Sequence, residues 1–219
     1  MPRRDARVRR RDPPRALIVA TRPLGLLCEL VLRHCECVST VAASAARARE
    51  HWAAGPPDIL VVEAGPRGVA NGDLLGLASP RSATVALTRA GDMRSLDAYR
   101  EGADAVSGIP FTPDELAVRV YTMLRLVHRD AAFSRKLRID AVELSLDETV
   151  RVDGSVTPLG PAKNSLLYYL AANHGRAIGR TDVRRDVWGA SGVSDRTLDR
   201  RVAALSRLLG DGPIYDTDS

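Results

Sequence analysis

The sequence predicts an α/β doubly wound domain followed by an α+β domain. Two patterns lead to this fold class: the first half alternates short apolar runs with helical segments, and the second half places a hairpin pattern before three helical segments. A polar stretch near residues 128–136 separates the halves. The chain length of 219 residues fits two domains of about 100 residues each, each large enough for its own core.

In the first half, the apolar runs have the length of buried parallel strands. They cover residues 16–20, 37–41, 58–63, 84–88 and 103–108. Helical patterns lie between them at 24–33, 43–52 and 93–101. This alternation predicts a parallel sheet, and ligands of such sheets bind at the carboxyl ends of the strands.

The last helix of the first half has a well-marked start. Thr112 is expected to cap it, Pro113 suits its first position, and Glu115 would complete a capping box. One face with helical spacing is apolar and should be buried; it consists of Leu116, Val120, Met123, Leu124 and Val127.

The second half has a different pattern of apolar and polar residues. Residues 144–159 alternate in polarity, and Asp153-Gly154 is a strong hairpin signal. Helical patterns follow at 161–173, 180–187 and 194–209, with Gly175 and Gly210 as helix stops. Strands followed by three helices indicate a winged-helix domain rather than another βαβ unit.

The net charge of +5 is concentrated at the start of the chain. Residues 1–15 contain seven Arg and two Asp, so the rest is neutral. This arm has few apolar residues and is expected to be disordered; it either contacts phosphates or is a solvated tail.

Composition excludes several classes of protein. No apolar run is long enough to span a membrane, and the N-terminus lacks the apolar stretch of a signal peptide. Three cysteines in a chain of this size argue against a disulfide framework and favour the reducing cytoplasm.

Several motifs in order resemble the OmpR/PhoB type of response regulator, over about residues 16–214. Residues 144–189, ending in Val-Trp-Gly, resemble its strand platform and first two helices, and SDRTLDRRVAALSRLLGD resembles its recognition helix. GADAVSGIPFTPDELAVRV and PPDILVVEAGPRG resemble parts of its receiver domain. The resemblance implies a receiver-like (flavodoxin-like) domain at 16–129, a linker at 130–136 and a winged helix-turn-helix domain at 137–219.

The resemblance also assigns the positions of the receiver chemistry. A receiver uses an acidic pair to hold magnesium, an acceptor Asp, a Thr or Ser, and a Lys. Here Ala20 and Thr21 replace the acidic pair, Glu63 replaces the acceptor, and Ile109 replaces the Lys; the aromatic switch position is Val106. Thr88 alone matches the family pattern. The receiver is therefore expected to be of the atypical, aspartate-less kind, unable to take up a phosphoryl group.

Alternatives stay open for this degenerate site. Glu63 either mimics a phosphorylated Asp or is a solvated carboxylate at a strand end. With Ala20 and Ile109, the vacated pocket is more apolar and either binds a small molecule or is without function.

The sequence indicates no metal, cofactor or enzymatic activity. His34, Cys35 and Cys37 lie close together but lack the second ligand pair of a zinc site, so they are interpreted as buried residues at a strand start. The sequence contains no Ser/His/Asp set and no P-loop.

The third helix of the second half is the candidate DNA-binding element. Its apolar stripe is expected to pack on the domain core: Leu198, Val202, Leu205 and Leu209. Arginines occupy the opposite stripe, where the alternative to DNA contact is a solvated face. The residues expected to read bases in the major groove are Arg196, Arg200, Arg201 and Arg207, and those expected to contact phosphate are Thr197 and Arg180.

Two departures from the family pattern affect the DNA-binding domain. Ala203, Ala204 and Ser206 stand where relatives often have basic residues, so a different sequence preference is expected. The last six residues, IYDTDS (214–219), lack the family's wing motif, so the wing is expected to be either truncated or vestigial.

The resemblance implies a symmetric dimer through the receiver domain. Arg94, Asp104, Glu115 and Arg119 occupy the positions of the family's cross-dimer salt bridges, the alternative being ordinary surface charge. The chain is thus predicted to be a cytoplasmic, homodimeric, sequence-specific transcription regulator that acts without aspartyl phosphorylation. The alternatives are a small-molecule-sensing regulator and a protein-interaction module that has lost DNA binding.

Overall fold

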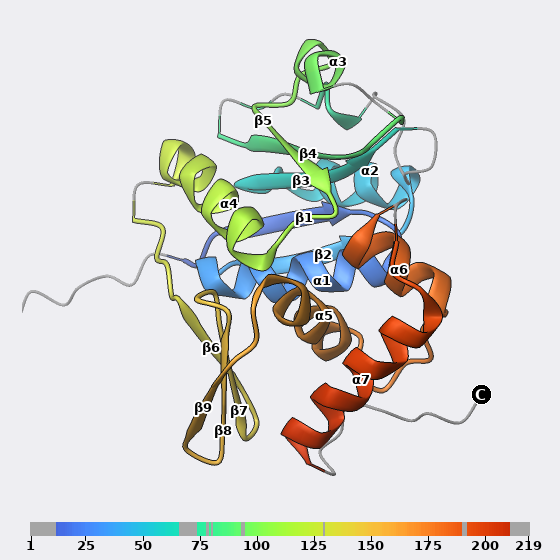
Figure 1. The fold of residues 1–219 in the computed structure, drawn as a ribbon. Helices are drawn as coiled ribbons and strands as arrows, with labels where there is room; N and C mark the ends of the chain where they lie inside the picture. Colours follow the sequence, from blue (N-terminus) through green and yellow to red (C-terminus); the bar gives the residue numbers. More distant parts are fainter. Residues whose placement is uncertain are drawn as a thin grey trace, which may run out of the picture.

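The computed structural model describes residues 12–65, 74–77, 79, 81–92, 95–128, 130–189 and 192–210, and the structural statements below concern these residues. The chain forms a receiver-like α/β domain followed by a winged-helix domain, which confirms the predicted fold class (Figure 1). No described helix is both long enough and apolar enough to span a membrane.

The first domain is built on a five-stranded parallel sheet. The strands are β1 (Arg15–Val19), β2 (Val38–Ala42), β3 (Ile59–Ala64), β4 (Ala83–Arg89) and β5 (Ala105–Ile109), in the order β2-β1-β3-β4-β5. Every residue of β3 and β4 is buried, as expected for central parallel strands covered on both faces. All five strands were predicted from their apolar runs to within two residues at either end.

Helices cover both faces of this sheet. They are α1 (Arg22–Leu32), α2 (Ala45–Ala54), α3 (Ser95–Arg100) and α4 (Pro113–Val127), with a short 3-10 helix η1 (Arg33–Cys35) after α1. Ile18, which points to one face, packs in a core with α1 and α4. Leu17, its neighbour, points to the other face and packs with Ala48 of α2 and Ala98 of α3.

The predicted capping box of α4 is wrong. Thr112 is the N-cap residue and Pro113 the first helical residue, but the Thr112 side chain makes no capping hydrogen bond. Glu115 instead pairs with Arg119 one turn later, at 3.4 Å. The apolar face is as predicted at its centre, where Leu116 and Val120 are fully buried.

The second domain begins with a four-stranded antiparallel sheet and continues with three helices. The elements are β6 (Lys136–Ile139), β7 (Val142–Ser145), β8 (Thr149–Val152), β9 (Ser155–Pro158), α5 (Pro161–Ala172), α6 (Arg180–Trp188) and α7 (Asp195–Leu209). Asp153 and Gly154 both have positive φ, 46° and 83°, and connect β8 to β9 as the hairpin signal predicts.

The ends of the predicted arm and linker are strand residues. Arg15 begins β1, and Pro14 accepts a hydrogen bond from the Val38 N–H at 2.8 Å, so the sheet starts inside the expected arm 1–15; residues 1–11 lie outside the described part. Lys136 begins β6, so the sheet also starts inside the expected linker.

The connection between the domains is packed against both of them. His34 Nδ1 bonds to the Ser134 carbonyl at 2.7 Å, and Nε2 bonds to the Tyr168 hydroxyl of α5 at 2.9 Å. His34 is fully buried, and burial lowers its pKa. The sequence predicted a buried residue here; it did not predict that this histidine joins the first domain, the connection and the second domain.

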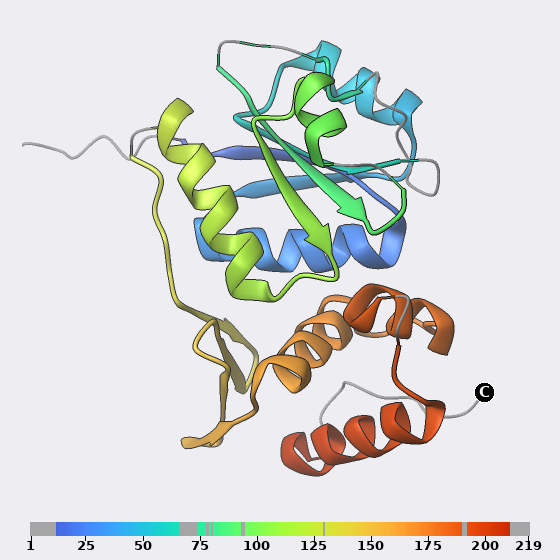
Figure 2. The same cartoon turned by 45° about the horizontal axis from the view of Figure 1, so that its top comes forward.

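The two domains share one hydrophobic core. It runs from Leu24 of α1 to Leu166 of α5, and Asn173 at the end of α5 donates to the Pro23 carbonyl at 3.1 Å. Figure 2 shows α5 lying against α1, with α7 on the side of the second domain that faces away from the five-stranded sheet. The described structure is therefore one packed body.

Candidate functional site

The expected receiver residues lie at the carboxyl ends of adjacent strands. Ala20 follows β1, Glu63 and Thr88 lie at the ends of β3 and β4, and Ile109 ends β5. The structure thus brings these positions to one edge of the sheet. All four are buried, and Ala20 has no exposed surface.

Glu63 is not a solvated carboxylate, and that interpretation is wrong. Its side chain is 2% exposed, and both oxygens are engaged. Oε2 accepts the backbone N–H of Thr21 at 2.8 Å, and Oε1 accepts two N–H groups of Arg89, from Nη2 at 2.9 Å and Nε at 3.2 Å. Thr21 therefore contributes its backbone to this site.

Arg89 is the functional-site residue that sequence reasoning missed. It is the last residue of β4, directly after Thr88, and its side chain is 9% exposed. Its Nη2 also donates to Asp186 Oδ1 of α6 at 2.8 Å. The available signal was a charged residue at the end of a strand expected to be buried, because a buried guanidinium needs a carboxylate partner.

Asp186 links this site to the second domain. Its side chain is fully buried and accepts hydrogen bonds from Arg89, from Arg185 Nε at 2.9 Å and from the Tyr169 hydroxyl of α5 at 2.9 Å. Burial and the neighbouring Asp186 raise the pKa of Tyr169, so its hydroxyl stays protonated and serves as a donor. Glu63, Arg89, Asp186 and Tyr169 form a continuous hydrogen-bonded chain between the domains, hereafter the Glu63–Tyr169 network.

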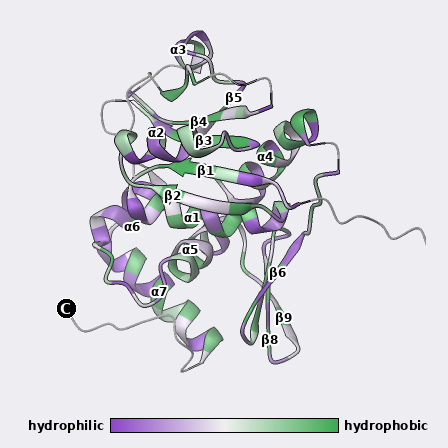
Figure 3. Ribbon diagram, turned by 180° about the vertical axis from the view of Figure 1, so that it is seen from behind, coloured by the Kyte–Doolittle hydropathy of each residue, from purple (hydrophilic) through white to green (hydrophobic). Residues whose placement is uncertain are grey.

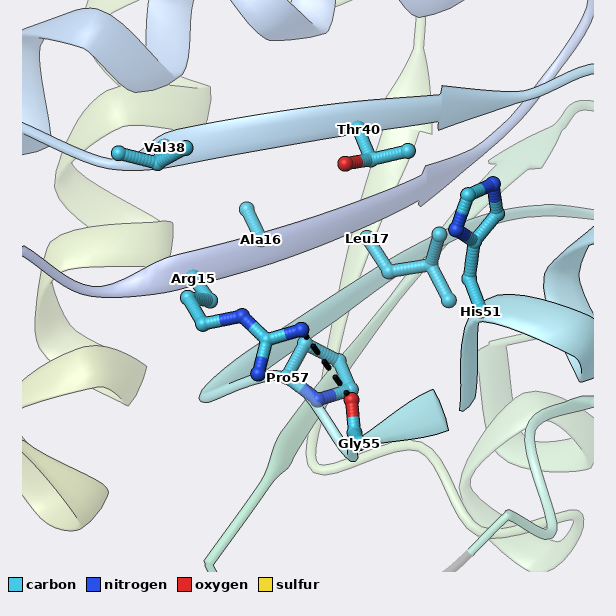
Figure 4. Close-up of a pocket in the computed structure, with 8 residues that line it drawn as sticks. All are labelled: Arg15, Ala16, Leu17, Val38, Thr40, His51, Gly55 and Pro57. Carbon is cyan, nitrogen blue, oxygen red and sulfur yellow. Dashed lines mark hydrogen bonds between the residues drawn. The ribbon is translucent and has the colours of Figure 1, made fainter. Parts of the chain in front are cut away.

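The two pockets described in the structure lie away from this network. One, of about 70 Å³, lies near the start of β1 and is lined by Arg15 and by His51 of α2 (Figure 4). The other, of about 290 Å³, is lined by residues of α1 and α5, among them Glu29 and Ala171. Neither is lined by Glu63 or Arg89, so neither supports the expectation of a ligand at the vacated acceptor site.

Helix α7 presents two different faces. Leu198, Leu205 and Leu209 are buried and Val202 is partly buried, so the apolar stripe packs inward. Arg196, Arg200 and Arg207 are exposed on the other side. Figure 3 shows the resulting mixture of hydrophilic and hydrophobic segments along α7. Ser194 caps the helix, accepting the N–H of Thr197 and bonding its hydroxyl at 3.0 Å.

The basic residues around α7 differ in how strongly the protein holds them. Arg201 is half-buried, with its guanidinium 5.1 Å from the ring centre of Trp188. Arg180 pairs with Asp199. Arg207 Nε donates to the Ala203 carbonyl at 3.1 Å. Within the described residues, Arg196 and Arg200 have no ion-pair partner, so they are the most available to a ligand.

Three of the expected dimer residues, Asp104, Glu115 and Arg119, have partners in their own chain. Asp104 accepts the N–H of Thr84 at 2.7 Å, and Glu115 pairs with Arg119 within α4. Arg94 lies outside the described residues. Exposed apolar side chains also lie on α3 and α4: Leu96, Tyr99 and Val118, each about half exposed.

Comparison with known proteins gives the family. Residues 154–216 match the family model "Transcriptional regulatory protein, C terminal". The transcriptional regulatory protein KdpE of Mycobacterium tuberculosis is 30% identical over 187 residues, which cover 81% of this chain and 79% of KdpE. The chain belongs to the OmpR/PhoB family of response regulators. It is a DNA-binding transcriptional regulator of this type.

Other members of the OmpR/PhoB family are also similar. The phosphate regulon regulator PhoB of Escherichia coli is 33% identical over 115 residues, which cover 51% of this chain and 49% of PhoB. The solved structure of DrrB, an OmpR/PhoB homologue of Thermotoga maritima, is 18% identical with a TM-score of 0.42 and covers 94% of each chain. Residues 214–219, where the sequence lacks the expected wing motif, lie outside the described residues.

Proposed function

We propose that this response regulator binds DNA in the cytoplasm as a homodimer and does so without phosphorylation of its receiver domain. One observation supports this most directly. The carboxylate at the acceptor position, Glu63, is already neutralised inside the protein by Arg89.

Phosphoryl transfer needs an accessible carboxylate and a cation that neutralises the transferred charge. Glu63 is 2% exposed, and both its oxygens accept hydrogen bonds. Ala20 supplies no carboxylate at the end of β1 for a divalent cation, and Ile109 supplies no ammonium group for phosphoryl oxygens. Both oxygens of Glu63 are instead held by donors of the protein itself, the Thr21 N–H and the Arg89 guanidinium.

The DNA-binding part of the proposal rests on α7. Arg196 and Arg200 are exposed on the outer face and have no ion-pair partner among the residues that the structure describes. An exposed guanidinium on a recognition helix can bind the edge of guanine in a major groove. Arg207 extends this face, and Arg201 and Thr197 border it. We expect Arg180 to contact the phosphate backbone by exchanging its partner Asp199 for phosphate.

Dimerisation is proposed through α3, β5 and α4. The half-exposed Leu96, Tyr99 and Val118 offer an apolar centre, and Glu115 and Arg119 at its edge can exchange their own pairing for a symmetric pairing with a second copy. Two copies would then place two α7 helices on repeated half-sites.

Fluorescence anisotropy tests the proposal. The full chain is titrated into labelled DNA from upstream of its own gene and into scrambled DNA, with and without acetyl phosphate and Mg²⁺. We expect specific binding with the same Kd in both conditions and no mass increase of the protein. A phosphorylated protein with tighter binding would overturn phosphorylation independence, and equal affinity for both DNAs would overturn specific binding.

A further inference from the structure

The Glu63–Tyr169 network joins the two domains through one side chain. Arg89 donates to Glu63 of the receiver domain and to Asp186 of α6, and its Nη1 also lies 3.5 Å from the Arg185 carbonyl. A planar guanidinium presents five N–H donors on three nitrogens in a fixed fork, whereas a lysine ammonium has three donors on a single nitrogen. The position of α6 is therefore tied to the carboxyl end of β4.

The last turn of α6 also approaches the same edge of the sheet closely at a second point. Gly189 ends α6 with φ +74°, and a Cβ at this position would lie 3.0 Å from Cδ of Pro110, which follows β5. The approach is so close that a side chain would force a shift. Helix α6 thus lies directly over the strand ends where a receiver carries out its chemistry (Figure 1).

The orientation of α6 determines that of the recognition helix α7. Arg184 of α6 pairs with Asp195 of α7 at 2.8 Å. Arg201 of α7 stacks over Trp188, the last residue of α6. The two helices are consequently held as one unit, so the contacts that position α6 on the receiver domain also set the orientation of α7.

The attachment leaves the DNA-binding face free. Arg196 and Arg200 are exposed while Arg89 holds α6, and α7 is on the far side of the second domain from the sheet (Figure 2). The contact is therefore compatible with DNA binding, and a role in blocking α7 does not fit.

We propose that Arg89 is a positioning residue for DNA binding: by bridging Glu63 and Asp186 it holds the α6–α7 unit in one orientation on the receiver domain. The degenerate acceptor site has thereby become a fixed attachment point for the DNA-binding domain. This inference rests on the DNA binding of the family and does not depend on phosphorylation independence.

Hydrogen exchange of the full chain tests the attachment, using Glu63→Gln. This substitution changes the receiver domain only, so amides of α6 and α7 should respond only if the network transmits it. We expect their exchange to accelerate by about tenfold or more relative to the amides of β3. The control is Asp58→Asn, just before β3, which removes a carboxylate that accepts the Arg15 N–H at 2.7 Å but contacts no residue of α6; it should not show this selective effect. Equal acceleration in both domains, or none in α6 and α7, overturns the proposal.

A triple variant covers the case in which Glu63→Gln does not fold. Glu63→Gln, Arg89→Met and Asp186→Asn together remove both buried carboxylates and the buried guanidinium of Arg89. Arg185, which is partly exposed, keeps its pair with Asp182, so the fold should survive. It should show the same selective exchange, and its affinity for DNA from upstream of the gene should fall by about fivefold or more. Undiminished affinity together with unchanged exchange in α6 would overturn the positioning role. Failure of the wild-type protein to bind specifically would instead count against the proposed function, and the exchange result would still decide the attachment.

Discussion

The receiver edge of the sheet and the outer face of α7 both depend on arginines, but in opposite environments. Arg89 is buried between two carboxylates of different domains, so its Nε and Nη2 donors are used within the protein. Arg200 is exposed and has no ion-pair partner among the described residues. The same type of side chain therefore has two uses. An arginine with carboxylate partners inside the protein holds two domains together, and an exposed arginine without such partners can bind a ligand.

The largest expected effect is on stability, when the buried contacts of Arg89 are removed. Arg89→Met leaves Glu63 with only the Thr21 N–H and removes one of the donors of Asp186. An uncompensated buried carboxylate typically costs about 3–5 kcal/mol, so the urea midpoint of unfolding should fall strongly. Arg47→Met, which removes an exposed pair with Glu50, is the control and should cost less than about 1 kcal/mol. Similar midpoints for the two variants would contradict the role of Arg89.

The recognition side should respond in binding rather than in stability. Arg200→Ala is expected to weaken specific DNA binding by about 1–3 kcal/mol if Arg200 contacts a base edge, with an unchanged unfolding midpoint. Arg201→Ala should lower both affinity and stability, because its guanidinium also packs on Trp188. Arg47→Ala removes the same charge far from α7 and serves as the control in anisotropy titrations. Unchanged binding in both α7 variants would refute this choice of recognition residues.

The residues that the sequence predicted depend on local patterns, whereas those it missed depend on contacts between residues far apart in the chain. Ala20, Glu63 and Ile109 could be placed because strand ends and family motifs are local patterns. Arg89 could not be paired, since Asp186 lies 97 positions further along the chain. His34 bonds to Tyr168 across 134 positions, and no local pattern specifies such a contact.

Local patterns also failed where two local bonds compete. A capping box was predicted at Thr112, but Glu115 pairs with Arg119 instead. Strand β6 was missed because its four residues, Lys136–Ile139, alternate for too short a stretch to be distinguished from a polar connection.

A smaller effect should appear with pH at the other junction between the domains. Burial lowers the pKa of His34 below its value in the unfolded chain, about 6.5. The unfolded state then binds more protons than the folded state as the pH falls below that value. Stability should therefore be complete above about pH 6.5 and decrease as the pH falls toward the folded pKa.

The measurement is the Tm between pH 7.5 and pH 5.5, compared with His34→Gln. Glutamine offers a donor and an acceptor for Ser134 and Tyr168 but does not titrate. We expect the variant to lose less stability over this interval than the wild-type protein. Identical slopes would show that His34 is not the titrating group.

The smallest expected effect concerns Arg180, which is exposed like Arg200 but paired with a carboxylate like Arg89. Arg180 is largely exposed but paired with Asp199, and such a surface pair contributes about 0–1 kcal/mol to stability. Arg180→Ala and Asp199→Asn should therefore change the unfolding midpoint little and to a similar extent. They should differ in DNA binding if Arg180 contacts phosphate. Arg180→Ala would weaken binding and reduce the salt slope by about 1, whereas Asp199→Asn would free the guanidinium, remove a negative charge near the DNA and tighten binding. Equal effects of the two variants on affinity would show that Arg180, like Arg89, acts through contacts within the protein and does not contact phosphate.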